Sequence, residues 1–263
     1  MMWLFIVGFG AIGLFVGSLF ATTVFRVVDH LPVKGRPSCR TCLAPVATAD
    51  LIPVVSYLRL RGRCRNCTSV IEWQYPAIEL AMGIVFAVLA ARTVLVPSLW
   101  FDVEQVKLGA LLIRDLVAAA TFVILFAYDV RQYVVPDKIS LPAILVIILM
   151  NIVLGIPAVA WIMGGLIGAL FFGIQYAVSG GHLVGSGDIR AGALVGVVLG
   201  FPGVLESIAG AYVLACIVAI PLFLSKKISS NDKAPFVAFL AVSTIVLLCT
   251  GPILNSVFFQ FFG

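Results

Sequence analysis

Charged residues are scarce in this sequence. Only 11% of its 263 residues are Asp, Glu, Lys or Arg, whereas 62% are hydrophobic and the mean hydropathy is +1.16. A soluble domain carries about 25% charged and about 45–50% apolar residues. The composition therefore excludes an ordinary soluble globular protein and predicts a chain that is solvated mostly by lipid.

Histidine is scarce too, which limits the possible catalytic chemistry. The two histidines, His30 and His182, fall in separate expected loops, and neither a Ser-His-Asp pattern nor a metalloprotease pattern is evident. A glycine-rich nucleotide motif of the Rossmann kind is also missing. The net charge of +5 does not indicate nucleic acid, because in so apolar a chain the placement of the charges matters more than their sum.

Long hydrophobic runs are abundant. A hydrocarbon core of about 30 Å needs about 20 apolar residues per crossing. The sixth run is short and ends at Phe201-Pro202-Gly203, which makes it a candidate for a broken helix or a half-span. We expect an all-α polytopic membrane protein with about eight transmembrane helices, at 2–25, 76–96, 108–128, 139–156, 158–178, 188–201, 203–224 and 235–254.

Basic residues indicate the orientation. Eight of the seventeen Lys and Arg residues lie between Arg26 and Arg65, in one long polar loop that should therefore be cytoplasmic. Counting spans from this loop puts both termini outside. It puts these further basic residues inside: Arg131, Lys138, Arg190, Lys226, Lys227 and Lys233. The exceptions, near the outer ends of the second and third spans, are Arg92, Lys107 and Arg114.

The expected domains follow from these spans. They are the first transmembrane helix (1–26), a polar loop domain (27–75), the second transmembrane helix with its outer loop (76–107), a six-helix domain (108–254) and a C-terminal tail (255–263).

The polar loop contains two cysteine pairs, Cys39-Arg-Thr-Cys42 and Cys64-Arg-Asn-Cys67. Their spacing matches a closed tetrahedral zinc site, and a loop this small gains stability from a metal cross-link. Disulfides are the alternative, but a cytoplasmic loop is reducing. We expect structural Zn²⁺ on Cys39, Cys42, Cys64 and Cys67, either as a staple alone or as part of a domain that shapes a catalytic pocket. Arg40, Arg63 and Arg65, beside these cysteines, are expected to help keep the thiols deprotonated.

Three acids lie at the ends of the expected spans, all on the cytoplasmic side: Asp129, Asp137 and Asp188. An acid in or beside a membrane span is costly and is a functional candidate by default. Asp137 follows Pro136 and has the character of a helix-start residue favoured by the helix dipole. Asp129 stands at the end of a helix, where the dipole disfavours it, so capping does not explain it.

Asp188 follows a turn with Gly185 and Gly187, whose missing side chains let another chain approach closely. Two neighbouring carboxyls can share one proton, because ionising both at short range is costly. The ionised member then activates a water, and the protonated member polarises a scissile carbonyl. Asp129 and Asp188 are the candidate pair, with Gly185, Gly187 and Asp137 as support.

In their order along the chain, these segments resemble the type IV prepilin peptidases, the leader peptidase/N-methyltransferase family of GxGD-type membrane aspartic peptidases. The resemblance covers nearly the whole chain. It rests on Gly17-Ser18-Leu19-Phe20, the two cysteine pairs, Asp50-Leu51-Ile52-Pro53-Val54, Tyr75-Pro76-Ala77-Ile78-Glu79-Leu80, Asp129 through Asp137, Gly185-Ser186-Gly187-Asp188 and Pro235-Phe236-Val237-Ala238-Phe239-Leu240. The chain departs from the family pattern at Ala21, Thr68 and Ile189-Arg190.

The resemblance implies that Asp129 and Asp188 cleave prepilin and pseudopilin precursors after a glycine, at the cytoplasmic face of the bacterial inner membrane. It also implies methylation of the freed amine from S-adenosylmethionine. Within the matched segments, Arg190 and Glu79 are expected to contact substrate or cofactor. The alternatives are a presenilin-like intramembrane protease, a proton-coupled transporter and a noncatalytic membrane scaffold.

Overall fold

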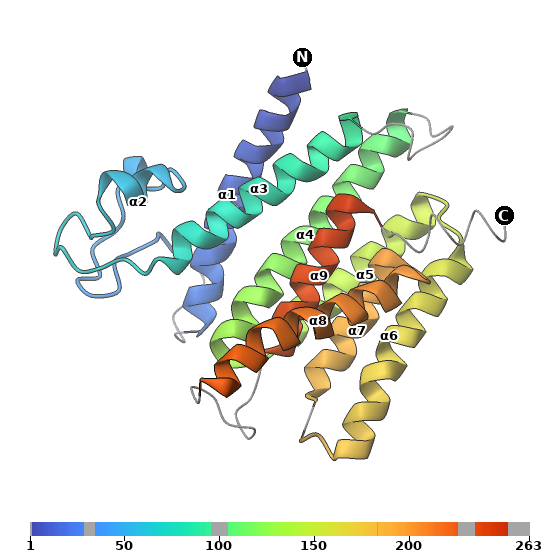
Figure 1. Cartoon of the computed structure of the whole chain (residues 1–263). Helices are drawn as coiled ribbons and strands as arrows, with labels where there is room; N and C mark the ends of the chain where they lie inside the picture. The colour runs from blue at the N-terminus through green and yellow to red at the C-terminus, as the bar shows by residue number, and fades with distance from the viewer. Residues whose placement is uncertain (1, 29–34, 96–104, 183, 226–234, 252–263) are drawn as a thin grey trace. The chain divides into compact units, whose positions relative to one another are not determined.

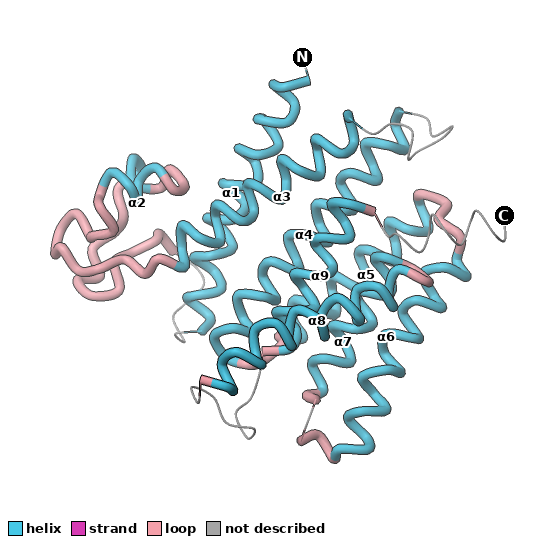
Figure 2. The backbone as a smooth tube through the Cα atoms, in the orientation of Figure 1, coloured by secondary structure: helices cyan, strands magenta, loops and turns pink. Residues whose placement is uncertain are grey.

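The structure is a computed structural model that describes residues 2–28, 35–95, 105–182, 184–225 and 235–251. His30, the expected cytoplasmic lysines 226, 227 and 233, and the expected tail 255–263 lie outside the described residues. The described part is mostly helical, and its β-structure is confined to two isolated bridges in the polar loop. Figure 2 draws most of the described chain as helix, with the most extensive loop structure in residues 35–73. An all-α fold is therefore confirmed.

The chain divides into two compact units, Met1–Leu95 and Val96–Gly263 (Figure 1). The first unit contains two long helices, α1 (Met2–Val28) and α3 (Gln74–Leu95). Between them, the polar loop carries only the short helices η1 (Thr48–Asp50) and α2 (Val55–Arg59).

Glycines bring α1 and α3 into close contact. A Cβ on Gly13 would lie 2.6 Å from the carbonyl oxygen of Met82, and one on Gly17 would lie 2.8 Å from the Cα of Glu79. Small residues allow such backbone approach in lipid, where van der Waals contact replaces the hydrophobic effect as the main driving force between helices. The α1–α3 pair is therefore a close-packed hairpin.

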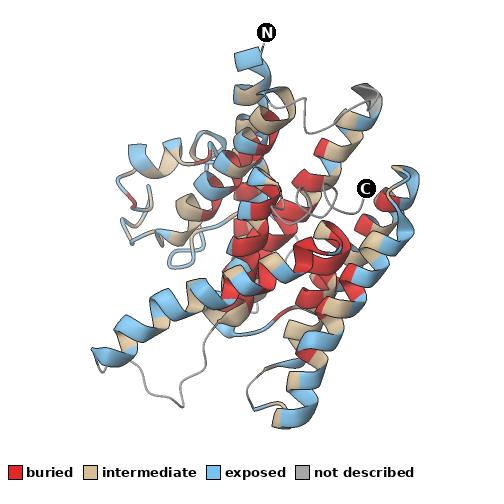
Figure 3. Ribbon diagram, turned by 45° about the vertical axis from the view of Figure 1, so that its right-hand side comes forward, coloured by how far each residue is buried: buried red, intermediate tan, exposed pale blue. Residues whose placement is uncertain are grey.

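In its described residues, the second unit is a bundle of six helices. The helices that pack against one another include α4 with α5 and α9, α6 with α7, and α8 with α9. The bounds are α4 Gln105–Gln132, α5 Asp137–Val153, α6 Ala158–Ser179, α7 Ser186–Leu199, α8 Gly203–Leu224 and α9 Phe236–Thr250. Figure 3 shows the buried residues gathered where helices face one another and the exposed ones along their outer faces.

The α6–α7 contact also depends on glycine. A Cβ on Gly164 would overlap the backbone of Gly196, and a Cβ on Gly168 would overlap the carbonyl of Gly192. The two helices thus meet backbone to backbone, with two glycines from each side.

Eight helices of 14 or more residues occupy the expected positions within the described residues. Five of them are long and apolar enough to cross a membrane by length and composition: 2–26, 74–95, 107–132, 158–179 and 203–224. The other three are shorter, and α9 is a short apolar helix. A polytopic membrane protein is supported, whereas eight full crossings stay a prediction.

The sixth run was expected over 188–201 and forms α7, of 14 residues. At about 1.5 Å per residue α7 is about 21 Å long, less than a hydrocarbon core of about 30 Å. It ends before Gly200, whose φ of +69° favours glycine. Of the two expectations for this segment, the half-span therefore agrees better with its length.

Candidate active site and four-cysteine cluster

Asp129 lies near the C-terminal end of α4 and is 5% exposed. Its Oδ2 accepts a hydrogen bond of 2.8 Å from the backbone N–H of Ala238, at the start of α9. The first N–H groups of a helix have no partner within that helix, and that end of the helix dipole is positive. A carboxylate placed badly for its own helix is thus held by the start of another.

The sequence did not reveal this contact. The segment Pro235-Phe236-Val237-Ala238 was recognised as a matching motif, but no role was assigned to it. The structure gives it one, because its N–H group anchors Asp129. Nothing in the sequence pairs residues that are so far apart along the chain.

Asp188 is half-buried in the first turn of α7. Its Oδ2 accepts a hydrogen bond of 2.7 Å from the N–H of Gly185, and its own N–H donates to the carbonyl of Gly185 at 3.1 Å. This reciprocal arrangement closes the helix start. Asp188 therefore caps its own helix.

The two glycines before Asp188 have different roles. A Cβ on Gly187 would lie 2.8 Å from the Cβ of buried Val135, in the connection between α4 and α5. A Cβ on Gly185 would lie 3.4 Å from the Asp188 carboxyl and 3.9 Å from the backbone nitrogen of Gly187, both ordinary van der Waals contacts. The expectation that both glycines allow close approach therefore holds for Gly187, which brings the start of α7 against the segment after Asp129.

Asp137 is the first residue of α5, after the N-cap residue Pro136. Its carboxylate forms an ion pair with Arg190 of α7. Asp137 thus starts a helix as expected, and it also links α5 to the helix that carries Asp188. The guanidinium of Arg190, expected to contact substrate or cofactor, is engaged by Asp137 here, and its binding role stays a prediction.

Asp129 and Asp188 come from helix ends far apart in sequence, and the close approach of Gly187 to Val135 brings the turn that carries Asp188 against the segment that follows Asp129. Two carboxyls within electrostatic reach favour sharing a single proton. The arrangement can supply a base and an acid from one pair of side chains, without a metal ligand among them.

The four loop cysteines converge in the first unit. One sulfur from each of Cys39, Cys42, Cys64 and Cys67 lies within 4.8 Å of the others, and all four cysteines are free of disulfides. The Sγ atoms of Cys39 and Cys67 are 3.7 Å apart. A tetrahedral site with metal–sulfur bonds of about 2.3 Å requires sulfurs about 3.8 Å apart, so the cluster can bind a metal ion.

The two cysteine pairs form repeated turns. Cys39 N–H donates to the Ala44 carbonyl at 2.9 Å, and Cys64 N–H donates to the Ser69 carbonyl at 2.8 Å. The residue after each pair has positive φ, +57° at Leu43 and +56° at Thr68. The departure at Thr68 from the family's usual glycine therefore falls at a backbone conformation that favours glycine.

The arginines of the loop do not stabilise the thiolates as expected. Hydrogen bonds from the backbone at Cys42 and from Ser69 lower the pKa of Cys39 to about 5. Ser69 also lowers the pKa of Cys67. Arg40 instead pairs with Glu72 at 2.6 Å, and Arg65 pairs with Asp50 through two bonds of 2.7 and 2.5 Å. The basic side chains cross-link the loop.

Glu79 lies in α3 and is 8% exposed. Its Oε2 accepts a hydrogen bond of 2.7 Å from the N–H of Val54, just before α2. The acid therefore anchors the polar loop to the membrane helix. Its expected contact with substrate or cofactor stays a prediction.

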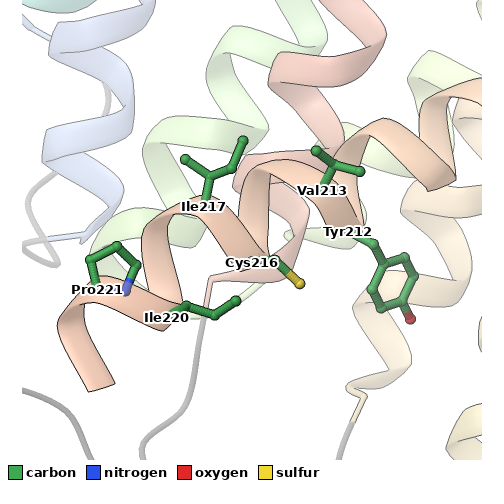
Figure 4. A pocket seen from close by; sticks show the side chains of 6 residues that line it. All are labelled: Tyr212, Val213, Cys216, Ile217, Ile220 and Pro221. Carbon is green, nitrogen blue, oxygen red and sulfur yellow. The ribbon is translucent and has the colours of Figure 1, made fainter. Parts of the chain in front are cut away.

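A shallow hollow of about 570 Å³ lies on the outer face of α8 (Figure 4). It is lined by Tyr212, Val213, Cys216, Ile217, Ile220 and Pro221. Its lining contains no acid, so it offers apolar contact and no catalytic group. At one end Tyr212 meets the ring of Phe236, at the start of α9, with the ring centroids 4.8 Å apart.

Comparisons with known proteins agree with this geometry. The family model described as Bacterial Peptidase A24 N-terminal domain matches residues 11–93, which contain the cysteine cluster. The model described as Type IV leader peptidase family matches residues 116–220, which contain Asp129 and Asp188. The chain belongs to the type IV leader peptidase family. Both family segments are thus present, one in each unit.

Members of this family resemble the chain along most of its length. The prepilin leader peptidase/N-methyltransferase of Bacillus subtilis (strain 168) is 26% identical over 246 residues, covering 91% of this chain and 92% of the relative. The protein of the same name from Neisseria gonorrhoeae is 26% identical, covering 82% and 81%. The one from Aeromonas salmonicida (strain A449) is 28% identical, covering 82% and 72%. No solved structure matches the chain.

Proposed function

We propose that this chain is a bifunctional membrane enzyme that removes the leader peptide from prepilin-like precursors and then methylates the new N-terminus. The single observation that carries the peptidase assignment is the packing of Gly187, beside Asp188, against Val135 in the segment that follows Asp129, in a member of this family. The names of the relatives support both activities. They do not support an intramembrane protease of the presenilin kind or a transporter.

In the proposed reaction, one carboxyl of the pair is ionised and takes a proton from a water. The water attacks the carbonyl carbon of the scissile peptide bond, and the protonated carboxyl donates a hydrogen bond to the carbonyl oxygen. The nitrogen of the leaving amine gains a proton as the bond breaks. The Ala238 N–H donates a hydrogen bond to Asp129 and so fixes the orientation of this carboxyl during the reaction.

We infer that the cysteine cluster holds Zn²⁺ as a structural cross-link, because four sulfurs at this separation satisfy its tetrahedral preference. Methylation would use S-adenosylmethionine, and this second activity is supported by the relatives' names. The basic loop from Arg26 to Arg65 supports a cytoplasmic position for the cluster, in the inner membrane of a bacterium. Precursors of pili and of type II secretion pseudopili are the substrates we propose.

Mass spectrometry of a pilin-like precursor tests both activities. The precursor is incubated with the detergent-solubilised protein, with and without S-adenosylmethionine. We expect loss of the leader in both samples and one added methyl group only with the donor. Cleavage without methylation would remove the second activity and keep the first.

Two substitutions test the pair itself. Asp129→Asn and Asp188→Asn each keep the shape of the side chain and remove its titration, so each should reduce cleavage below detection while the protein stays folded. Asp137→Asn, which removes the charge of a supporting acid, is the matched control and should retain most activity. If either member of the pair can be replaced without loss, that residue is not catalytic.

A further inference from the structure

Helix α7 is the shortest helix that the structure describes in its unit. It begins beside Asp188 and stops at Leu199, about 21 Å later. The last four carbonyl groups of a helix have no partner within the helix, and lipid provides no donors. Other side chains must therefore satisfy the carbonyl groups at this end.

Two side chains from two other helices do so. Arg114 of α4 donates from Nη2 to the carbonyl of Val198 at 2.5 Å. Asn151 of α5 donates from Nδ2 to the carbonyl of Val197 at 2.9 Å, and it is 1% exposed. A cation is favourable at the negative end of a helix dipole. Both donors are thus placed to hold the C-terminal end of α7.

The charge of Arg114 is balanced locally. Its Nε lies 3.2 Å from Oδ1 of Asp115, and both side chains are about nine-tenths buried. A buried arginine is costly unless it is paired and hydrogen-bonded. This ion pair and the hydrogen bond to α7 explain why the unit retains a charge at this depth.

The remaining contacts of α7 include its packing against α6 and one ion pair near its N-terminal end. Against α6 it packs through glycines, with Phe172 of α6 seated on Gly192 and Val197 of α7 seated on Gly165. The ion pair between Arg190 and Asp137 lies at that N-terminal end, where the Asp137 side chain is 57% exposed. An exposed ion pair contributes little stability. The buried anchors at the C-terminal end are a stronger restraint than this ion pair.

Helix α4 connects both ends of this arrangement. It carries Asp129 near one end and Arg114 about 22 Å away along the helix. Helix α4, which carries Asp129, therefore also binds the C-terminal end of α7, the helix that carries Asp188. We propose that Arg114 and Asn151 are positioning residues that set the depth of Asp188 relative to Asp129. This inference rests on the proposed peptidase function.

The consequence for catalysis follows from geometry. A displacement of about 1 Å in a catalytic group can cost about 100-fold in rate. The proton shared by two carboxyls also depends on their separation, since their repulsion falls with distance. Releasing the far end of α7 should therefore change both the rate of cleavage and its dependence on pH.

Asn151→Leu is the first test, because leucine is close in size to asparagine and lacks only the polar group. We expect kcat for precursor cleavage to fall by about 10-fold to 100-fold with KM little changed, and the pH profile to shift. Arg114→Met should do the same or more, and Arg114→Lys should restore part of the rate by keeping a cation at the helix end.

Thr121→Val is the matched control. Thr121 is a buried polar residue of α4 whose hydroxyl bonds to Val117 of its own helix and makes no bond to α7. It should leave kcat and the pH profile unchanged. Thermal unfolding in detergent measures the folded fraction of every variant. Misfolding lowers the number of active molecules without changing their pH profile, so a rate loss with an unaltered pH profile indicates misfolding.

The results of these experiments distinguish failure of the proposed peptidase function from failure of the positioning role. A wild-type protein that leaves the precursor intact overturns the proposed function. A wild-type protein that cleaves, together with an Asn151→Leu variant of equal kcat and unchanged pH profile, overturns the positioning role alone. A folded Asn151→Leu variant with lower kcat and a shifted profile supports it.

Discussion

The two units pack helices against each other in the same way, through glycines, but their other stabilising contacts differ. In each unit, glycines let two helices touch along their backbones: α1 with α3 in the first, and α6 with α7 in the second. The described part of the polar loop in the first unit has only short helices, together with two ion pairs and four clustered sulfurs that can bind a metal ion. The second unit is held by helix contacts and by side chains at helix ends.

This difference predicts which kind of substitution should destabilise each unit. A water-exposed loop of this size buries too little apolar surface to be stable without cross-links. A helical bundle in lipid depends on shape, because lipid tails are as apolar as the helices themselves. Loss of a metal ligand should therefore damage the first unit, and a single added methyl group in the wrong place should damage the second.

Cys39→Ser should have the largest effect, and it should be confined to the first unit. Structural zinc in small sites contributes on the order of 10 kcal/mol to folding. Three remaining sulfurs should bind metal far more weakly, so the loop should unfold and methylation should be lost. Metal content measured by mass spectrometry and methyl transfer to a pre-cleaved peptide check this. Cleavage of the precursor should fall much less, and equal loss of both activities would contradict the separation of the two units.

Gly168→Ala should have the next largest effect, now in the second unit. The new methyl group would overlap the carbonyl of Gly192, and neither backbone can yield without moving its helix. Overpacking of this kind costs about 1–3 kcal/mol, so thermal unfolding of the bundle should shift downward and cleavage should fall, while bound metal is unchanged. Gly173→Ala in the same helix is the control. Nothing lies within 4 Å of its Cβ, so it should not destabilise the bundle.

The sequence predicts the helices well because long apolar runs are local signals. The expected run 203–224 is the helix Gly203–Leu224, and the expected run 158–178 is the helix Ala158–Ser179. The cysteine cluster was also predictable, since the spacing of a Cys-x-x-Cys pair itself constrains where the sulfurs lie. Both successes depend on residues close together in the chain.

Contacts between distant residues could not be predicted in this way. The bond from Ala238 to Asp129 joins a backbone N–H to an acid in another helix, and every residue type offers such an N–H. The roles of Arg114 and Asn151 were hidden for the same reason, because their acceptors are backbone carbonyls. Arg40 and Arg65 were misassigned because neighbours in sequence were taken as neighbours in space, whereas their partners are Glu72 and Asp50.

The ion pair between Asp50 and Arg65 also cross-links the loop. Pairing with Arg65 lowers the pKa of Asp50, and Arg59 contributes to the same direction. A lowered pKa in the folded state stabilises the loop above the unfolded pKa of about 3.9, and this stability is lost as pH falls through the lowered value. Asp50→Asn should therefore destabilise the loop at neutral pH, and the difference from wild type should vanish in acid.

Chemical unfolding of the loop, followed at several pH values, measures that difference. Loss of metal in acid affects both proteins equally, so the comparison isolates the ion pair. Glu72→Gln is the control. Its side chain is 39% exposed, against 4% for Asp50, so its effect should be smaller at every pH. An equal effect of the two substitutions would mean that burial does not strengthen the Asp50 pair.

The smallest expected effect is a gain in stability, from Thr68→Gly. Thr68 has φ of +56°, a conformation that is especially unfavourable for a β-branched residue and is open to glycine. The substitution also removes the bond from the Thr68 hydroxyl to the Cys67 carbonyl, but that bond is exposed and worth little net. Glycine further increases the entropy of the unfolded chain, which offsets part of the gain. The relief of strain should prevail by about 0.5 kcal/mol, raising the unfolding midpoint of the loop. Val70→Gly, outside the positive-φ region, should lower the midpoint, and a decrease in both variants would show that Thr68 is not strained.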